Sequence, residues 1–240
     1  MKVPSLSEML EAGVYFGHKK ERSHPRAKSF IYTLRNGVYV INLEMTQELL
    51  AEALKFLEKT ASEGKTILFV GTKPQAKELI KKTAEELQMP YVTFRWLGGT
   101  LTNFETIKKN IDSLKKLEEE VSSEEFKKLT KKEKALKQEK LDKMHKVLDG
   151  ISSLKKLPDA LFIIDTNHER IAVSEARKKE IPTVGICDTN SNPDIIDYPI
   201  PSNDDAVSAI EMILKLVADA IKSGLVKKKP EKGDKNGKKK

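Results

Sequence analysis

The stretch from His18 to Arg35 concentrates the residue types that bind phosphates. It holds six Lys and Arg residues against one acidic residue, Glu21, and its aromatic and His rings can pack or stack on bases. Gly17 and Pro25 predict a loop here. A solvated surface loop is the competing interpretation, but the concentration of charge favours polyanion binding. The candidate phosphate-binding residues are Lys19, Lys20, Arg22, His24, Arg26, Lys28 and Arg35.

A second candidate is the segment Arg95–Phe104, which follows a predicted strand and opens with Arg95-Trp96. Trp96 is the only Trp of the chain, and an indole beside a guanidinium can stack on a base or on the Arg itself. A buried Trp that anchors a hinge explains the same residue equally well. Arg95 and Trp96 are therefore candidate binding residues, with both interpretations of Trp96 open.

A third candidate, Val70–Pro74, leads from a predicted strand into the N-terminus of a predicted helix. Free backbone N–H groups and the helix dipole favour an anion there, so Gly71–Lys73 could hold a phosphate. The Gly and Lys spacing of a P-loop is absent, and Gly98-Gly99 does not match the dinucleotide fingerprint. The interpretations, from most to least favoured, are a plain turn, an RNA phosphate contact and a nucleotide pocket.

Asp165 and Asp188 each stand just past an apolar run, at the edge where open α/β sheets bind ligands. Their possible partners in a cation or acid/base site are Asp204, Asp205, His18 and His168. The surrounding residues are also typical of turns and helix caps, which is the simpler interpretation. Because no activated nucleophile or metal-spaced ligand set accompanies these acids, no enzymatic activity, metal or cofactor is predicted. Cys187 is expected to be a small core residue.

Alternating strands and helices must position these residues. The apolar runs of strand length are Val38–Leu43, Thr66–Val70, Tyr91–Phe94, Ala160–Ile164 and Pro182–Cys187. The segments with helical spacing of apolar residues are Thr46–Ser62, Pro74–Leu87, Glu169–Lys179 and Asp204–Lys222. This alternation predicts a doubly wound α/β fold with a mainly parallel sheet.

The segment of residues 102–150 breaks the alternation. It carries 13 Lys against 11 acidic residues, and its apolar residues, spaced by three or four, predict an antiparallel helical hairpin. Two capping-box patterns, Ser122-x-x-Glu125 and Thr130-x-x-Glu133, predict a short extra helix between the two arms.

Charge is distributed unevenly along the chain. The net charge is +8, but the basic stretch and residues 227–240, with eight Lys, together exceed it, so the remainder is slightly acidic. This pattern indicates a polyanion bound at defined places. Residues 227–240 are too polar to offset the entropy of ordering and are predicted to be a disordered tail. The predicted organisation is an α/β core of residues 1–101 and 151–226, a helical hairpin of residues 102–150 and the tail of residues 227–240.

Length and composition exclude several classes of protein. The 240 residues suffice for one fold or two domains with a real core. A single Cys excludes an intramolecular disulfide framework and a multi-thiolate zinc site. No apolar run approaches the roughly 20 residues of a membrane span, and none follows Met1 as in a signal peptide. A cytosolic protein without a membrane partner is therefore expected.

Eight motifs occur in a characteristic order over nearly all of residues 5–222. They are LSEMLEAGVYFGH (Leu6–His18), NLE (Asn42–Glu44), LFVGTK (Leu68–Lys73), RWLGGTLTN (Arg95–Asn103), LTKKE (Leu129–Glu133), PDALFIID (Pro158–Asp165), DTNSNPD (Asp188–Asp194) and IPSNDD (Ile200–Asp205). With this ordered set the chain resembles the bacterial-type ribosomal protein S-two family.

The resemblance implies a Rossmann-like or flavodoxin-like three-layer α/β/α core with a protruding helical hairpin. It implies a structural role in translation at the junction of head and body of the small ribosomal subunit, in the cytoplasm. The implied partners are small-subunit ribosomal RNA, neighbouring ribosomal proteins and the large mRNA-binding ribosomal protein S-one. The basic stretch, Arg95 and Trp96 then become candidate RNA-binding residues. Two alternatives stay open: a nucleotide- or Mg²⁺-binding enzyme or regulator using the crevice near Gly71–Lys73, Asp165 and Asp188, and a free mRNA-binding or signalling module.

Two features depart from the family pattern. Glu180 stands before Ile181-Pro182 where the family usually has Gly, so the preceding helix is expected to end without a left-handed cap. The Lys-rich residues 227–240 differ from the often acidic family tail. The tail is therefore interpreted either as a further RNA contact or as a mobile end.

Overall fold

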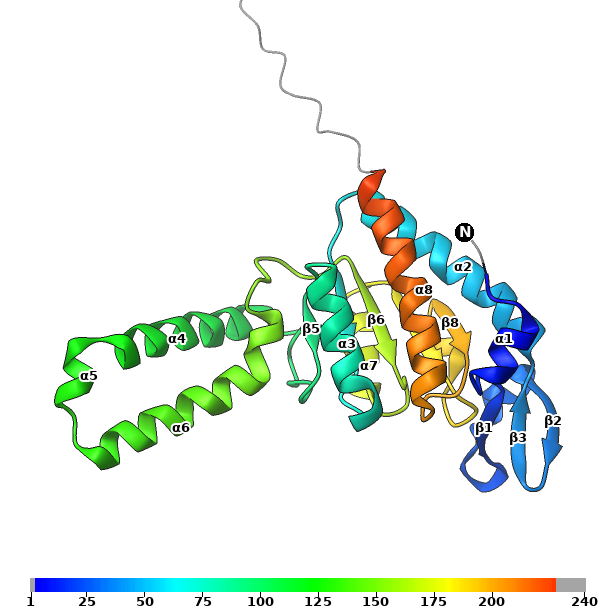
Figure 1. The fold of residues 1–240 in the computed structure, drawn as a ribbon, viewed down its shortest axis with the longest axis horizontal. Helices are drawn as coiled ribbons and strands as arrows, with labels where there is room; N and C mark the ends of the chain where they lie inside the picture. Colours follow the sequence, from blue (N-terminus) through cyan, green and yellow to red (C-terminus); the bar gives the residue numbers. More distant parts are fainter. Residues whose placement is uncertain (1–2, 228–240) are drawn as a thin grey trace, which may run out of the picture.

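The computed structural model describes residues 3–227. At its centre is a five-stranded parallel sheet in the order β5-β4-β6-β7-β8 (Figure 1). The strands are β4 (Ile67–Val70), β5 (Tyr91–Val92), β6 (Ala160–Ile164), β7 (Thr183–Cys187) and β8 (Tyr198–Pro201). Every neighbouring pair is parallel, so the carboxyl ends of all five strands lie at one edge of the sheet. The predicted α/β fold with a mainly parallel sheet is confirmed.

Helices cover both faces of this sheet, which explains why its inner strands are continuous apolar runs. The helices on one face are α2 (Leu43–Ser62), α3 (Pro74–Glu86) and α8 (Val207–Val226). The other face is covered by α7 (Arg170–Lys178) and the base of the helical hairpin. Successive residues of β6 serve the two layers, Phe162 packing in the first and Ile163 in the second. The result is the expected three-layer α/β/α arrangement.

The helical hairpin follows β5 and precedes β6 in the chain, and it extends away from the sheet (Figure 1). It consists of α4 (Phe104–Ser122), the short α5 (Glu124–Lys128) and α6 (Lys131–Leu148). The predicted capping box of Thr130 and Glu133 is formed at the start of α6. The one predicted at Ser122 is wrong, because α4 continues through Ser122 and the next residue, Ser123, caps α5.

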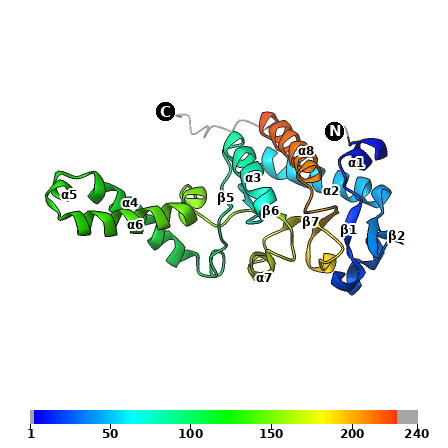
Figure 2. The same cartoon turned by 60° about the horizontal axis from the view of Figure 1, so that its bottom comes forward.

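The N-terminal part forms a second, antiparallel sheet in the order β1-β3-β2, and Figure 2 shows it at the end of the molecule opposite the hairpin. Its elements are α1 (Leu6–Glu11), β1 (Phe16–Lys19), β2 (Ile31–Arg35) and β3 (Val38–Ile41). The predicted loop is therefore limited to residues 20–30, and the prediction is wrong at both ends of the stretch, which are strands. Gly17 lies inside β1, and Pro25 opens a 3₁₀ turn, Pro25–Phe30, where its fixed φ suits a first helical position.

Element boundaries differ from the prediction where polar capping or Pro intervenes. Strand β3 ends at Ile41, because Asn42 caps α2 and starts the helix at Leu43, three residues before the predicted start. Strand β8 was not predicted from sequence, because two of its four residues, Pro199 and Pro201, are Pro. Pro is tolerated here because β8 is an edge strand.

The expectation for Glu180 is also wrong. Helix α7 does end in a left-handed cap, and Glu180 itself adopts it, with φ of 55°. The Ile181 N–H donates to the Ala176 carbonyl (3.0 Å) and the Glu180 N–H donates to the Arg177 carbonyl (3.2 Å). These two bonds are the Schellman pattern, so tertiary structure imposes the cap without Gly.

Residues 228–240, and with them nearly all of the predicted tail, lie outside the described residues. The division of the chain into core, hairpin and tail stays a prediction. Within residues 3–227 no helix combines the length and the apolarity required to cross a membrane.

Candidate nucleic-acid interface

The basic segment, residues 18–35, presents its cations to solvent. The exposed members are Lys19, Lys20, Arg22, Arg26, Lys28 and Arg35. Arg26 forms an ion pair with Asp194, with 3.4 Å between Nε and Oδ2 and both side chains more than half exposed. Such an exposed pair contributes about 0–1 kcal/mol, so Arg26 remains available to a stronger anionic partner.

The backbone of the basic segment is fixed to the core through Thr189. The His24 N–H donates to the Thr189 carbonyl (2.8 Å), and the His18 N–H donates to the Thr189 hydroxyl (2.8 Å). Gly17 permits this approach, since a Cβ there would lie 2.7 Å from Thr189 Cγ2. Phe30 is buried in the core beneath the segment. A fixed backbone with outward cations is pre-organised for phosphate contacts.

Two further contacts set the shape of the basic segment. The half-buried His24 caps the 3₁₀ turn, its Nδ1 accepting from the Arg26 N–H (3.1 Å). Lys19 and Arg35 both pair with Val38, one on each side of β3, which holds these two cations in one row. His24 therefore has a structural role in addition to its predicted one.

A charged centre lies at the carboxyl edge of the large sheet. Its members are Lys73, Asp165, Asp188, Asp204, Asp205 and His18. Lys73 Nζ lies 2.6 Å from Asp204 Oδ1, 2.6 Å from Asp205 Oδ1 and 3.0 Å from Asp165 Oδ2. The structure thus unites most of the polar residues predicted for this edge, while His168 is exposed and donates its backbone N–H to Asp165 (2.8 Å).

His18 joins the basic segment to the charged centre. Its Nδ1 lies 3.0 Å from Asp188 Oδ2, and its Nε2 lies 3.6 Å from Asp205 Oδ2. The hydrogen bond to Asp188 raises the pKa of His18 against the opposing effect of burial. A protonated His18 therefore offsets part of the negative charge of the centre.

Asp204 is the most constrained member of the charged centre. Its side chain is fully buried, and its Oδ2 has no hydrogen-bond partner. Burial raises the pKa of Asp204 to about 7, with further increases from Asp165 and Asp188 and an opposing effect from Lys73. One ligand atom each of His18, Asp188 and Asp204 lie within 4.8 Å of one another, so these side chains could hold a divalent cation.

Lys73 keeps its positive charge in this environment. Burial lowers the pKa of Lys73, but its hydrogen bonds and charge interactions with Asp204, Asp205 and Asp165 raise it further, above the ordinary value. Four carboxylates surround this one ammonium and the neighbouring imidazole, so the centre attracts cations and repels phosphates.

The helix N-terminus after Gly71 is occupied from within the chain. The Thr72 N–H and hydroxyl both donate to Glu169 Oε1, at 2.8 Å and 2.6 Å, and Glu169 is buried. A carboxylate thus takes the place that a phosphate would take, and Lys73 points to carboxylates. The geometry favours the plain-turn interpretation of Gly71–Lys73 over a nucleotide pocket.

Arg95 and Trp96, adjacent in the sequence, differ in exposure. Arg95 is exposed, whereas Trp96 is 6% exposed and donates its indole N–H to Glu175 Oε1 (3.2 Å). The same carboxylate accepts the backbone N–H groups of Gly99 (2.6 Å) and Leu101 (2.9 Å). Trp96 therefore anchors the hinge of the hairpin, as one of its two interpretations predicts. Sequence reasoning missed Glu175, because an acidic residue on an amphipathic helix normally faces water.

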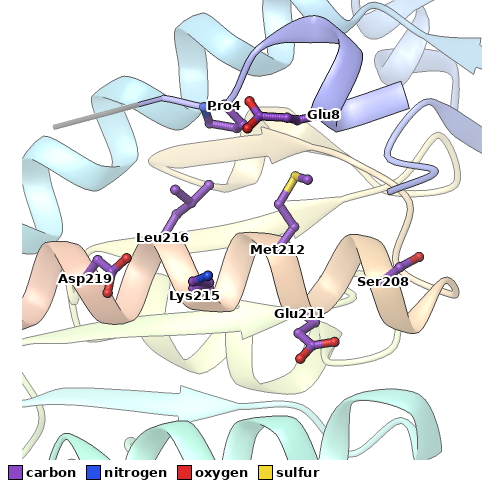
Figure 3. Close-up of a pocket in the computed structure, with 8 residues that line it drawn as sticks. All are labelled: Pro4, Glu8, Ser208, Glu211, Met212, Lys215, Leu216 and Asp219. Carbon is purple, nitrogen blue, oxygen red and sulfur yellow. The ribbon is translucent and has the colours of Figure 1, made fainter. Parts of the chain in front are cut away.

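A cavity of about 540 Å³ lies between α1 and α8, away from the charged centre (Figure 3). Met212 and Leu216 of α8 rise toward the segment that carries Pro4 and Glu8. Its eight lining residues include neither a His nor a Cys.

Cys187 is buried, and burial raises the pKa of its thiol to about 12, as expected of an unreactive core residue.

Comparison with known protein families identifies the family of the chain. The family described as ribosomal protein S2 matches residues 9–224. The chain belongs to the ribosomal protein S2 family. This span includes the whole basic segment, the charged centre and the helical hairpin. Membership of the S2 family makes the protein a structural constituent of the small ribosomal subunit.

Proposed function

We propose that the protein attaches to small-subunit ribosomal RNA through the basic segment and thereby holds its place in the ribosome. The observation that carries this proposal is a run of six exposed Lys and Arg side chains on a backbone tied to the core at Thr189. Phosphate contacts of this kind set the position of a protein and carry no sequence information. Specificity then comes from RNA shape and from neighbouring proteins.

The charged centre supports a structural role over the alternative of a nucleotide-binding enzyme or regulator. A nucleotide phosphate at this edge would face Asp165, Asp204 and Asp205, while Lys73 is already paired with all three. The Asp188 side chain also holds His18, the first residue of the basic segment. We therefore assign the centre to positioning the segment.

Charge reversal in the basic segment tests the proposal. Replacing Arg22, Arg26 and Lys28 by Glu should strongly reduce incorporation into small subunits, measured by immunoblot across a sucrose gradient of cell lysate. A matched control reverses Lys55, Lys59 and Lys215, which are exposed on α2 and α8 and change the net charge equally. Unchanged subunit occupancy of the first variant would overturn the assignment.

Salt provides a second readout. Each lost phosphate contact should reduce the slope of log affinity against log salt by about 0.7 to 0.9. The wild-type protein should comigrate with small subunits in moderate salt and dissociate in high salt. A protein that stays at the top of the gradient in both conditions would favour an extra-ribosomal module instead.

Docking of the large mRNA-binding protein S-one is the finer part of the proposal. The small sheet exposes three large apolar side chains, Phe16, Tyr32 and Leu34, which suit a contact with another protein. Replacing Tyr32 and Leu34 by Ser should reduce the amount of S-one that copurifies with small subunits without removing this protein from them. Full retention of S-one would contradict docking at this sheet.

A further inference from the structure

Phe94 is an exposed aromatic residue in a basic environment. It lies two residues after the end of β5, at the carboxyl edge of the large sheet, and its side chain is 51% exposed, whereas Trp96, two residues later, is buried. Solvent contact of a large apolar ring is unfavourable, so a partner that covers the ring would gain free energy. The position falls outside the residues assigned to the basic segment.

One cation contacts this ring, and two more belong to the elements that carry it and Lys77. Lys77 Nζ of α3 lies 5.7 Å from the centroid of the Phe94 ring, within reach of a cation–π contact. Arg95 is exposed and adjacent in the sequence, and Lys81 is exposed one helical turn after Lys77, on the same face of α3. An aromatic face flanked by cations is the arrangement with which proteins bind single-stranded nucleic acid.

We propose that Phe94 stacks on an unpaired base of RNA, while Lys77 and Arg95 contact the adjoining phosphates. The inference rests on the proposed RNA attachment and adds a second contact to it. Single-stranded RNA is the partner that fits, because bases splayed out of a helix stack on aromatic rings and their phosphates demand nearby cations. A neighbouring protein that binds this basic, aromatic surface is the competing explanation, and the test distinguishes the two.

The second contact lies at a distance from the first. Strand β5 and strand β7, which leads into Thr189, are three strand spacings apart in the sheet, or about 14 Å. Lys73 and Asp165 of the charged centre follow the two strands between them, β4 and β6, and the carboxylates of the centre repel phosphates. The RNA would thus touch the protein on both flanks of the centre.

The experiment measures binding of the full chain to a single-stranded oligoadenylate of about 12 nucleotides and to an RNA duplex of the same length. Phe94→Leu should weaken binding of the single strand by about 5- to 150-fold, the range of one lost stacking contact. Binding of the duplex should stay within about twofold, because its bases are not free to stack. Phe94→Trp should retain single-strand binding, and its exposed indole fluorescence should be quenched by the single strand.

The matched control is Leu136→Ala, on the hairpin, which removes a similarly exposed apolar side chain and should change neither affinity. Equal losses for single strand and duplex in Phe94→Leu would overturn stacking. So would an assembly defect without any loss of RNA affinity, which would place a protein on the ring. If only the variant of Arg22, Arg26 and Lys28 lost affinity, the proposed function would survive without this inference; if neither variant lost affinity, both would fail.

Discussion

At the carboxyl edge of the large sheet Lys73 is held by three carboxylates, while a short distance away Lys19, Arg22 and their neighbours in the basic segment are exposed to solvent. Lys73 and the cations of the basic segment lie at the same end of the fold. Folding neutralises the first within the chain and leaves the second for a partner. Buried ion pairs are costly to break from one side, whereas exposed charges contribute little to stability.

The largest expected effect comes from Lys73→Met. The substitution leaves the buried carboxylates of Asp165 and Asp204 without their cation, which should lower the free energy of unfolding by about 3–5 kcal/mol. Urea unfolding followed by far-UV circular dichroism measures the loss. The triple substitution of Arg22, Arg26 and Lys28 by Ala is the control and should stay within about 0.5 kcal/mol. If Lys73→Met also lowered the free energy of unfolding only slightly, Lys73 and the basic segment would not differ in their contribution to stability.

Glu175→Ala should come second, at about 3 kcal/mol, because it leaves several donors unsatisfied at once, and those of Trp96 and Leu101 are buried. These donors are the Trp96 indole and the backbone N–H groups of Gly99, Leu101 and Thr102. Trp96 is the only Trp, so a red shift of its fluorescence would report the opening of the hinge. Glu180→Ala serves as the exposed control on the same helix end. An unshifted spectrum and an unchanged free energy of unfolding would show that the Glu175 carboxylate does not stabilise the hinge.

The third effect is a pH dependence from Asp204. Because its pKa is raised to about 7, the folded state binds a proton that the unfolded state has lost, so stability is present at low pH and falls as pH rises from about 4 to about 7. The raised pKa of His18 acts in the same direction above about 6.5. Asp204→Asn should flatten the curve by about 2–4 kcal/mol, measured by urea unfolding in the presence of a chelator. Asp219→Asn, on the exposed side of α8, should leave the curve unchanged.

The smallest expected effect is a gain in stability. Glu180 is exposed, and its cost lies in the left-handed backbone, so Glu180→Gly should raise stability by about 1 kcal/mol, or the melting temperature by about 2–4 °C. Lys178→Gly, at the last residue of the same helix, should instead lower stability, by at most about 1 kcal/mol. A loss in Glu180→Gly would show that this exposed charge makes an interaction of its own.

Prediction from sequence succeeded where one local signal decided the structure. Ala160–Ile164 is an unbroken apolar run, and β6 has these same bounds because both faces of the strand are covered. Pro74 fixed the start of α3 in the same way. In the small sheet β3 was predicted, but β2 was missed because its residues other than Ile31 are exposed, so no alternation of buried and exposed residues marks this strand.

The candidate site was predictable in its residue types and less so in its contacts. The Asp residues after two strands were expected at one edge, because parallel strands end together. That Lys73 would bind Asp204, 131 residues away, and that Glu169 would fill the anion position at Thr72 depend on tertiary packing. The assignment of the basic segment and Arg95 to RNA stays a prediction.

The bond between the His18 N–H and the Thr189 hydroxyl joins residues 171 positions apart. During synthesis at about 5–20 residues per second, roughly 9 to 34 s separate the emergence of the two. The basic segment therefore leaves the ribosome long before the residue that fixes its backbone exists. The nascent protein acquires its finished basic surface only near the end of its own translation, which links maturation of that surface to completion of the chain.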